Sequence, residues 1–330
     1  MSRKKLIFVI LSFAVLFCFL FLKFKNHSFK KKHTVFENCV LVDIPSTYDT
    51  DKQKAFFYRS RSTKPLIVSL HSWGGTYSQK DSLALFSYQQ DWNYIHPDYR
   101  GAQWNPNSCC FPPSVQDIDD AIHYAILHGN VDTNNIFVIG KSGGGSGVLA
   151  AFLKSKFKNL NCMAWSPITD HVAWHDEVLL DTILKKKYFN KILIGTNSKD
   201  TFNVTMAKAK SVQYMVVDSF SEYKSKKLTI YEGILDGIKG STSIAQSIKF
   251  YNHLLQKWNV SDSNVYVDNK EFQHLFSERT SIKPTNTFLG KRKIIHSEQF
   301  NNVKLILFDG DHEILFDAAI NELKKNHKIN

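Results

Sequence analysis

A short apolar segment that ends in a glycine-rich turn limits the possible folds of this chain more than any other feature. Residues 136–139 are all apolar, and the next five residues are Gly140-Lys141-Ser142-Gly143-Gly144. Residues 148–152 then form an apolar run that suits a helix. The pattern G-x-S-x-G between a strand and a helix is typical of a nucleophile elbow, where glycines are needed because backbone segments pass close together. Ser142 is therefore the candidate nucleophile.

The same residues also resemble the end of a phosphate-binding loop, G-x-x-x-x-G-K-[ST], which would imply a bound nucleotide. That motif needs a glycine at position 135, where this chain has Asn135. It would also place the strand-like residues 136–139 inside a loop. We therefore reject the nucleotide-binding interpretation and expect no cofactor.

Strand-like and helix-like segments alternate through most of the chain. Strands are expected at residues 39–44, 55–59, 65–70, 92–96, 136–139, 161–165, 191–196, 228–232 and 303–308, and helices at residues 81–87, 115–126, 148–152 and 244–255. Alternation at this spacing predicts an α/β fold with a doubly wound, mostly parallel sheet. Ser114 is expected to cap the second helix, and residues 291–296 to pair with the last strand across Asn301 and Asn302.

Two regions interrupt the alternation. Residues 170–227 are rich in aromatic residues, histidine and charge, and we predict that they form a small cap insertion. Residues 260–290 show little periodicity and are expected to be irregular. Both regions belong to one predicted α/β domain, residues 38–330.

A serine hydroxyl becomes a strong nucleophile only when a general base removes its proton and an acid orients that base. When such a serine follows a central strand, the acid and the base come later in the chain, each after a strand. Asp236 follows the strand at residues 228–232 on a glycine-flanked loop, and His312 follows the last strand. The order Ser142, Asp236, His312 therefore predicts a catalytic triad.

Each of these residues also has a simpler interpretation. Asp236 could be an ordinary turn carboxylate, and His312 could cap the last helix. The occurrence of three suitable residue types in the right order, each after a strand, favours the triad. Asp200, which follows the expected strand at residues 191–196, is the alternative acid.

An oxyanion hole needs two backbone N–H donors. The amide of Gly143, directly after the nucleophile, should be one donor. The amide of Trp73, in the loop after the strand at residues 65–70, should be the other. Ser72 and Gly74 in that loop, together with Lys141 beside the nucleophile, are candidate substrate-binding residues.

Two further residues at strand ends have side chains that suggest chemistry. His71 ends the strand at residues 65–70, and Arg100 follows the strand at residues 92–96. We expect both to hold loops in place, Arg100 through an ion pair, rather than to act on the substrate.

The positive charge of the chain is concentrated at its N-terminus. The formal net charge is +12, and residues 1–32 carry eight basic side chains and no acidic one. The rest of the chain has 34 basic and 30 acidic side chains, so a nucleic-acid partner is not expected.

Residues 6–22 carry no charge and lie between basic residues. Their length and flanks predict a transmembrane signal anchor, since no small-residue cleavage site follows. Residues 1–5 would be its basic flank and residues 23–37 a basic spacer. The expected location is a single-pass membrane protein with its catalytic domain outside the cytoplasm.

Four cysteines lie in the predicted domain, and none has the spacing of a metal ligand: Cys39, Cys109, Cys110 and Cys162. We therefore expect no metal site. Whether these cysteines are free or paired in disulfides stays open.

Five sequence blocks occur in a characteristic order: residues 70–75, 97–101 and 140–145, then Asp236, then residues 310–313. Together they resemble the α/β-hydrolase superfamily, and within it the catalytic domain of prolyl-oligopeptidase-type serine hydrolases, especially their single-domain bacterial relatives. The resemblance covers about residues 38–325. It implies an α/β-hydrolase fold and acyl transfer by Ser142, Asp236 and His312. The oligopeptidases also carry a large β-propeller that selects substrates, for which this chain has no room.

These features predict a membrane-anchored serine hydrolase that acts on small carboxylic esters. A serine peptidase of prolyl-oligopeptidase type is the main alternative, and the expected partner is a small ester or peptide substrate. An acyltransferase would use the same triad but pass the acyl group to an alcohol. A non-catalytic binding module is the last alternative, because a fold does not determine a function. The sequence gives no indication of the oligomeric state.

Overall fold

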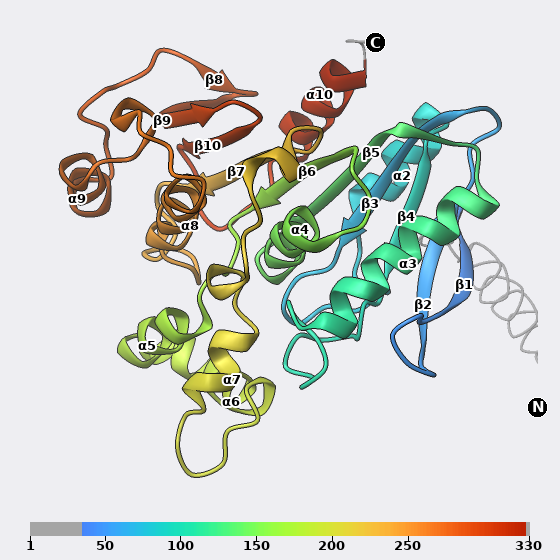
Figure 1. The fold of residues 1–330 in the computed structure, drawn as a ribbon, viewed down its shortest axis with the longest axis horizontal. Helices are drawn as coiled ribbons and strands as arrows, with labels where there is room; N and C mark the ends of the chain where they lie inside the picture. Colours follow the sequence, from blue (N-terminus) through green and yellow to red (C-terminus); the bar gives the residue numbers. More distant parts are fainter. Residues whose placement is uncertain (1–34, 328–330) are drawn as a thin grey trace, which may run out of the picture.

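The computed structural model describes residues 35–327, which form one sheet of ten strands with helices on both faces (Figure 1). The strands lie in the order β1-β2-β4-β3-β5-β6-β7-β10-β9-β8. Their bounds are Val40–Pro45 (β1), Lys52–Tyr58 (β2), Lys64–Leu70 (β3), Asn93–Pro97 (β4), Val131–Lys141 (β5), Leu160–Trp165 (β6), Lys227–Gly233 (β7), Phe288–Leu289 (β8), Arg292–Phe300 (β9) and Val303–Phe308 (β10).

The middle strands β4, β3, β5, β6, β7 and β10 all run parallel. The strands β1, β2, β9 and β8 pair antiparallel at the two edges. A parallel strand that is buried on both faces needs apolar side chains at successive positions, and residues 136–139 in β5 are at most 1% exposed. The predicted doubly wound, mostly parallel sheet is confirmed, as is the hairpin of β9 and β10.

Two groups of helices cover the sheet. The helices α3 (Pro112–His128), α4 (Gly143–Lys154) and α8 (Ile244–Lys257) pack into the larger apolar core on one face. The helices α2 (Ser82–Gln90) and α10 (Phe316–His327) pack into a second core on the other face. Helix α4 is buried along almost its whole length, so the residue just before it is held rigidly.

The cap insertion contains three helices, α5 (His171–Leu180), α6 (Thr182–Gly195) and α7 (Val204–Ala209), which form a separate lobe at the bottom of Figure 1. The strand expected at residues 191–196 is wrong, because residues 191–195 are the last part of α6. Helix α6 starts at Asp181, whose carboxylate accepts hydrogen bonds from the amides of Ile183 and Leu184, both at 2.8 Å. A short apolar run suits a strand and a buried helix turn equally well, so the sequence pattern misled here.

Two other expectations about local structure need correction. Ser114 does not cap α3 but lies inside it, because Pro112 and Pro113 occupy the first turn, where proline's missing N–H is no loss. Residues 260–290 are not wholly irregular, since they contain α9 (Asn269–Glu278). The carboxylate of Asp268 starts α9 by accepting a hydrogen bond from the Glu271 amide at 2.8 Å.

No helix within residues 35–327 combines the length and the apolar content needed to cross a membrane. The membrane helix predicted over residues 6–22 lies outside the described residues. The structure thus gives no support to the membrane part of the fold prediction. We withdraw that part, together with the predicted single-pass location.

Candidate active site

Ser142 lies on a sharp turn between the end of β5 and the start of α4. Its backbone angles are φ 59° and ψ −124°, a conformation that residues other than glycine rarely adopt. Such strain persists only where the surroundings hold it, and it is common at functional sites. Here the Ser142 amide donates a hydrogen bond to the Trp165 carbonyl at 2.9 Å, which ties the turn to the end of β6.

Glycines on both sides of Ser142 allow the turn to close. A Cβ atom on Gly140 would lie 2.5 Å from the Gly144 carbonyl carbon, far closer than real Cβ contacts. A Cβ atom on Gly143 would lie 2.8 Å from the backbone nitrogen of Trp73. The glycines predicted from the elbow pattern are therefore required by backbone packing.

The same proximity brings together the two amides predicted for the oxyanion hole. Gly143 is the first residue of α4, so its N–H has no acceptor within the helix and lies at the positive end of the helix dipole. Trp73 lies in the loop after β3, and its carbonyl accepts a hydrogen bond from the Gln103 amide at 2.9 Å. Two adjacent backbone donors in a fixed loop can stabilise a negative charge that develops on a carbonyl oxygen.

Asp236 and His312 meet at the carboxyl ends of β7 and β10. Nδ1 of His312 lies 2.6 Å from Oδ2 of Asp236, the distance of a strong charge-assisted hydrogen bond. The Asp236 side chain is fully buried, and its Oδ1 accepts hydrogen bonds from the amides of Gly237 (2.9 Å) and Thr242 (3.1 Å). These bonds fix the carboxylate, which in turn holds the imidazole with Nε2 as its basic atom.

A second buried carboxyl group, that of Glu232, lies near the end of β7, four residues before Asp236. Oε2 of Glu232 accepts a hydrogen bond from the Ser247 hydroxyl at 2.6 Å, and the side chain is fully buried. Burial, reinforced by the charge of Asp236, raises the pKa of Glu232 well above its usual value. Burial therefore favours the neutral form of Glu232, four residues before the acid that contacts His312.

The Ser142 hydroxyl has no hydrogen-bond partner among the residues that the structure describes, so its contact with His312 stays a prediction. The two loops do meet, because Nζ of Lys141 lies 3.5 Å from the His312 carbonyl oxygen. Burial lowers the pKa of Lys141. Serine–histidine contacts are often long without substrate and tighten when substrate binds.

The remaining predicted residues differ in their surroundings. The amide and hydroxyl of Ser72 both donate to Oε1 of Gln79, at 3.1 and 2.7 Å, so this side chain holds its own loop. Gly74 faces the ring of Trp104, where an added Cβ atom would lie at 3.3 Å. Asp200, the alternative acid, is exposed in the cap insertion beyond α6. The structure pairs His312 with Asp236 instead.

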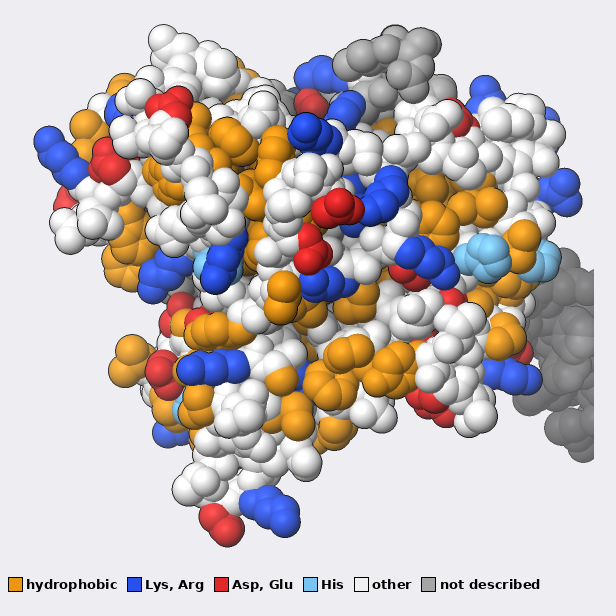
Figure 2. All heavy atoms as spheres, viewed as in Figure 1, with side chains coloured by type: hydrophobic (Ala, Val, Ile, Leu, Met, Phe, Trp, Pro, Cys, Tyr) orange, Lys and Arg blue, Asp and Glu red, His pale blue; other side chains and the backbone are white. Residues whose placement is uncertain are grey.

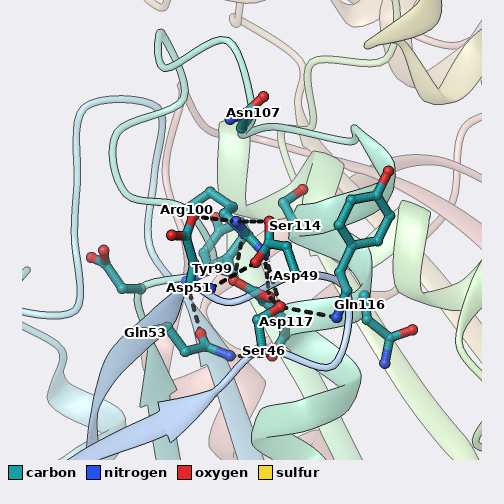
Figure 3. Close-up of polar contacts among 12 residues, drawn as sticks. Ser46, Asp49, Asp51, Gln53, Tyr99, Arg100, Asn107, Ser114, Gln116 and Asp117 are labelled. Atoms are coloured by element: carbon teal, nitrogen blue, oxygen red, sulfur yellow. Dashed lines mark hydrogen bonds and ion pairs between the residues drawn. The ribbon is translucent and has the colours of Figure 1, made fainter.

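Arg100 holds loops together through ion pairs, as expected (Figure 3). Its guanidinium lies 2.8 Å from carboxylate oxygens of Asp49, Asp51 and Asp117, and it also donates to the Ser46 hydroxyl. These partners link the β1–β2 turn to α3. Arg100 thus has a structural role, because its ion pairs hold these segments together.

His71 also fixes a loop, and its side chain is fully buried. Its Nε2 lies 2.8 Å from the Asp98 carbonyl oxygen and its Nδ1 lies 3.1 Å from that of Ser72. Burial lowers the pKa of His71 to about 4 and outweighs the two carbonyl contacts, which favour the charged form. His71 is therefore a buried support of the loop that carries Trp73, and burial favours its neutral form.

Gln103, beside the site, had not been identified from sequence, and neither had the contact of Trp174 with Trp73. Gln103 is fully buried, its side-chain oxygen lies against Gly143, and its Nε2 donates to the Tyr99 hydroxyl at 2.9 Å. Trp174 of the cap insertion packs edge-on against Trp73 with ring centroids 4.9 Å apart. The sequence drew attention to the loop after β4 only through Arg100, which lies three residues before Gln103. No sequence pattern links Trp174 to Trp73.

Cys39, Cys109, Cys110 and Cys162 are all free thiols in the structure. Cys109 and Cys110 are buried side by side, close to the cap insertion. Within residues 35–327, no group of three or more histidine, cysteine or carboxylate side chains is arranged to hold a metal ion.

Solved structures share this fold at low sequence identity. The esterase Pf2001 of Pyrococcus furiosus matches in two crystal forms, with TM-scores of 0.53 and 0.51 and identities of 13% and 15%. Those matches cover 87% and 88% of this chain and 90% of the esterase. This likeness confirms the expected α/β-hydrolase fold.

A Pyrococcus horikoshii acylaminoacyl peptidase matches with a TM-score of 0.49 and 17% identity, over 66% of this chain and 35% of the peptidase. This chain therefore spans about a third of the length of that enzyme. No protein-family profile matches the chain, and no curated protein matches its sequence.

Proposed function

We propose that this chain is a serine hydrolase that cleaves small carboxylic esters through an acyl-enzyme on Ser142. The observation that carries the proposal is the strained serine turn together with the Asp236–His312 pair at the same edge of the sheet. A binding module needs neither a strained serine nor a buried acid–imidazole pair. Each of these features costs folding free energy, and a catalytic role explains why the fold keeps it.

In the proposed reaction, Nε2 of His312 takes the proton of the Ser142 hydroxyl as its oxygen attacks the substrate carbonyl carbon. Asp236 holds the imidazole and stabilises the imidazolium that forms. The negative charge on the carbonyl oxygen is stabilised by the Gly143 and Trp73 amides. His312 then protonates the leaving alcohol, and a water molecule activated by the same histidine releases the acid.

The surroundings of the site support an ester substrate over a peptide. Trp73, Trp174 and Tyr188 form an aromatic cluster beside the oxyanion loop, with ring centroids 4.9 and 5.3 Å apart along it. Such a cluster can form one wall of an apolar pocket for a short acyl group. An alkoxide also leaves with less help from a general acid than an amine does, so an ester demands less accurate substrate positioning.

A fluorophosphonate probe and a substrate panel test the proposal. The probe should label the wild-type protein on Ser142, and Ser142→Ala should lose the label while keeping the circular dichroism spectrum of the wild type. Acetyl and butyryl p-nitrophenyl esters should be cleaved with a higher kcat/KM than proline-containing and basic peptide anilides.

Three outcomes would contradict the proposal at different levels. Labelling of Ser142→Ala at Ser146 or elsewhere would remove the nucleophile assignment. A higher kcat/KM for the peptides would keep the triad but favour a peptidase. Transfer of the acyl group to an added alcohol faster than to water would favour an acyltransferase.

A further inference from the structure

Cys109, Cys110, His171 and Lys210 form a buried cluster between the oxyanion loop and the cap insertion. Sγ of Cys109 lies 3.4 Å from Nε2 of His171, 3.7 Å from the Lys210 carbonyl oxygen and 4.0 Å from Sγ of Cys110. All four side chains are at most 1% exposed. The proposed triad uses none of them, so the cluster needs its own explanation.

The backbone at this cluster is strained and tightly held. Cys109 has a φ of 67°, which is unusual for a residue other than glycine. Its carbonyl accepts a hydrogen bond from the Ser114 hydroxyl. Nζ of Lys210 donates to the carbonyls of Asn105 and Ser108, at 3.0 and 3.4 Å, and so fixes the loop that leads to Cys109. The two adjacent thiols are thereby kept on the same side of a rigid loop.

The charges in the cluster favour a thiolate. Burial lowers the pKa of Lys210, while the Cys109 and Cys110 thiols favour its charged form, and within residues 35–327 no carboxylate lies within ion-pair distance of its Nζ. A buried cation is stabilised by a nearby anion, and the acidic groups beside it are the two thiols. Burial raises the pKa of Cys109, but the Cys110 hydrogen bond and His171 outweigh it and bring the pKa well below its usual value. A thiolate is the reactive form of cysteine.

A cavity reaches Cys110, the direct neighbour of Cys109 in the pair. It has a volume of about 420 Å³ and is lined by Cys110 together with residues of α3 and of the cap insertion, among them Gln116 and Met215. Water-sized reagents fit such a space easily. The cysteines are therefore shielded from large molecules but adjoin space that a small oxidant can enter.

We propose that Cys109 and Cys110 are a site of reversible oxidation by a peroxide, which closes a disulfide between them. The Cys109 thiolate attacks one oxygen of hydrogen peroxide, the O–O bond breaks, and the hydroxide released takes up a proton to leave as water. The sulfur of Cys110, losing its proton to the leaving oxygen, then displaces the hydroxyl of the Cys109 sulfenic acid as a second water. Two thiols lose two electrons, and one peroxide becomes two water molecules.

This disulfide should be easy to reduce again. Adjacent Cα atoms are about 3.8 Å apart, whereas disulfides usually join Cα atoms about 4.4–6.8 Å apart, so the bond would be strained. Strained disulfides have higher reduction potentials and are typical of regulatory rather than structural bonds. The thiol form of the structure is thus the resting state of a reversible pair.

Oxidation should also affect the proposed active site. The sulfur atoms must approach from 4.0 Å to about 2.05 Å, which withdraws Sγ of Cys109 from His171. The His171 ring packs against that of Trp73, with centroids 5.4 Å apart, and the Trp73 amide is a proposed oxyanion donor. This coupling rests on the proposed hydrolase function, whereas the oxidation itself does not.

Mass spectrometry of the full chain tests the oxidation directly. After treatment with hydrogen peroxide, the peptide that contains Cys109 and Cys110 should lose two hydrogen atoms in mass and resist alkylation under denaturing conditions. Dithiothreitol should restore both properties. Cys162 is also buried, but burial raises its pKa to about 12, so it should stay alkylatable. Equal alkylation of Cys39, Cys109, Cys110 and Cys162 after peroxide would overturn the proposed site.

Esterase activity tests the coupling. Peroxide should lower kcat of the wild type by at least about fivefold, reversibly with dithiothreitol, because a shifted oxyanion donor costs a tenfold factor or more. Cys109→Ser, Cys109→Ala and Cys110→Ser should be insensitive, while the matched Cys162→Ser variant should remain sensitive. Disulfide formation without a change in kcat would overturn the coupling. A reduced protein without esterase activity would instead count against the hydrolase function.

Discussion

The central sheet and the cap insertion differ in how much of their apolar side chains is buried. The apolar residues 136–139 of β5 are at most 1% exposed, whereas Leu180 and Ile183 in the cap insertion are 90% and 77% exposed. Figure 2 shows the hydrophobic side chains on the surface of this lower lobe. The sheet positions the proposed triad through many buried contacts. The cap insertion instead combines side chains buried against the sheet domain with exposed apolar ones, so its substitutions should differ sharply in effect.

Trp174 is one of the buried attachments of the cap insertion. It is fully buried, its Nε1 donates to the Ser241 carbonyl at 2.7 Å, and its ring packs between Trp73 and Tyr188. Ser241 belongs to the loop that also carries Asp236. One tryptophan therefore links the cap insertion to both the oxyanion loop and the acid loop.

The largest expected difference between the two regions concerns the two candidate acids. Asp236→Asn should lower kcat for a p-nitrophenyl ester by about ten-thousand-fold, because the amide no longer holds His312 in its reactive form. Asp200→Asn, on the exposed surface of the cap insertion, should change kcat by less than about twofold. The reverse ranking, measured on variants with wild-type circular dichroism spectra, would assign the acid to the cap insertion.

The next effect concerns stability. Trp174→Ala removes a buried ring from the junction and should lower the free energy of unfolding by about 3–5 kcal/mol. Leu180→Ala removes a largely exposed side chain in the same helix and should change it by less than about 0.5 kcal/mol. Urea denaturation measures both values. Similar losses of unfolding free energy for the two variants would mean that the burial of a side chain does not determine its contribution to stability in the cap insertion.

The two regions should also respond to pH in opposite directions. His71, beside the sheet, has its pKa lowered from 6.5 to about 4 by burial, so the unfolded chain takes up a proton before the fold does. Its contribution to stability is therefore lost as the pH falls from about 6.5 to about 4. Glu177 in the cap insertion has its pKa raised from 4.5 to about 7 by burial, so the fold holds a proton that the unfolded chain has lost. Its contribution is lost as the pH rises from about 4.5 to about 7.

Each shift corresponds to a change of about 3 kcal/mol over its full pH range. Urea denaturation between pH 4.5 and 7 should show that Glu177→Gln gains stability relative to the wild type as the pH rises. His71→Gln should lose the steep fall in stability on acidification. Parallel curves for the wild type and either variant would mean that the group titrates alike in the folded and unfolded chain.

The same contrast explains what the sequence could and could not predict. In the sheet, residues 136–139 of β5 form a continuous apolar run, and the proposed triad residues follow β5, β7 and β10. In the cap insertion, residues 191–195 have an apolar run as well, but they complete a helix whose start at Asp181 lies ten residues earlier. A short apolar run therefore identifies a strand correctly only where flanking residues and length exclude a buried helix turn.

Contacts between distant segments set a second limit. Cys109 and His171 are 62 positions apart and meet only because the cap insertion folds back onto the loop after β4. Gln103 likewise reaches Gly143 through the tertiary fold. No periodicity or motif in a single sequence encodes such pairs, whereas the order of serine, acid and histidine is fixed by the succession of strands.

The smallest expected effects concern two aspartates that start helices, one in each region. Asp181 accepts hydrogen bonds from the Ile183 and Leu184 amides at the start of α6 and is otherwise exposed. Asp181→Ala should therefore cost about 1 kcal/mol, the usual value for a lost N-cap. Asp181→Asn should restore most of it, because the amide oxygen also accepts these bonds.

Asp81 starts α2 in a buried setting, with one oxygen on the Leu83 amide at 3.0 Å and the other on the Tyr94 hydroxyl at 2.6 Å. Asp81→Ala removes the cap and also leaves the buried Tyr94 hydroxyl without its acceptor, so the loss should reach about 2–3 kcal/mol. Combining it with Tyr94→Phe should recover the part due to the unpaired hydroxyl. If Asp81→Ala costs no more than Asp181→Ala in urea denaturation, burial of a cap adds nothing to its contribution, and the contrast between sheet and cap insertion does not extend to their helix starts.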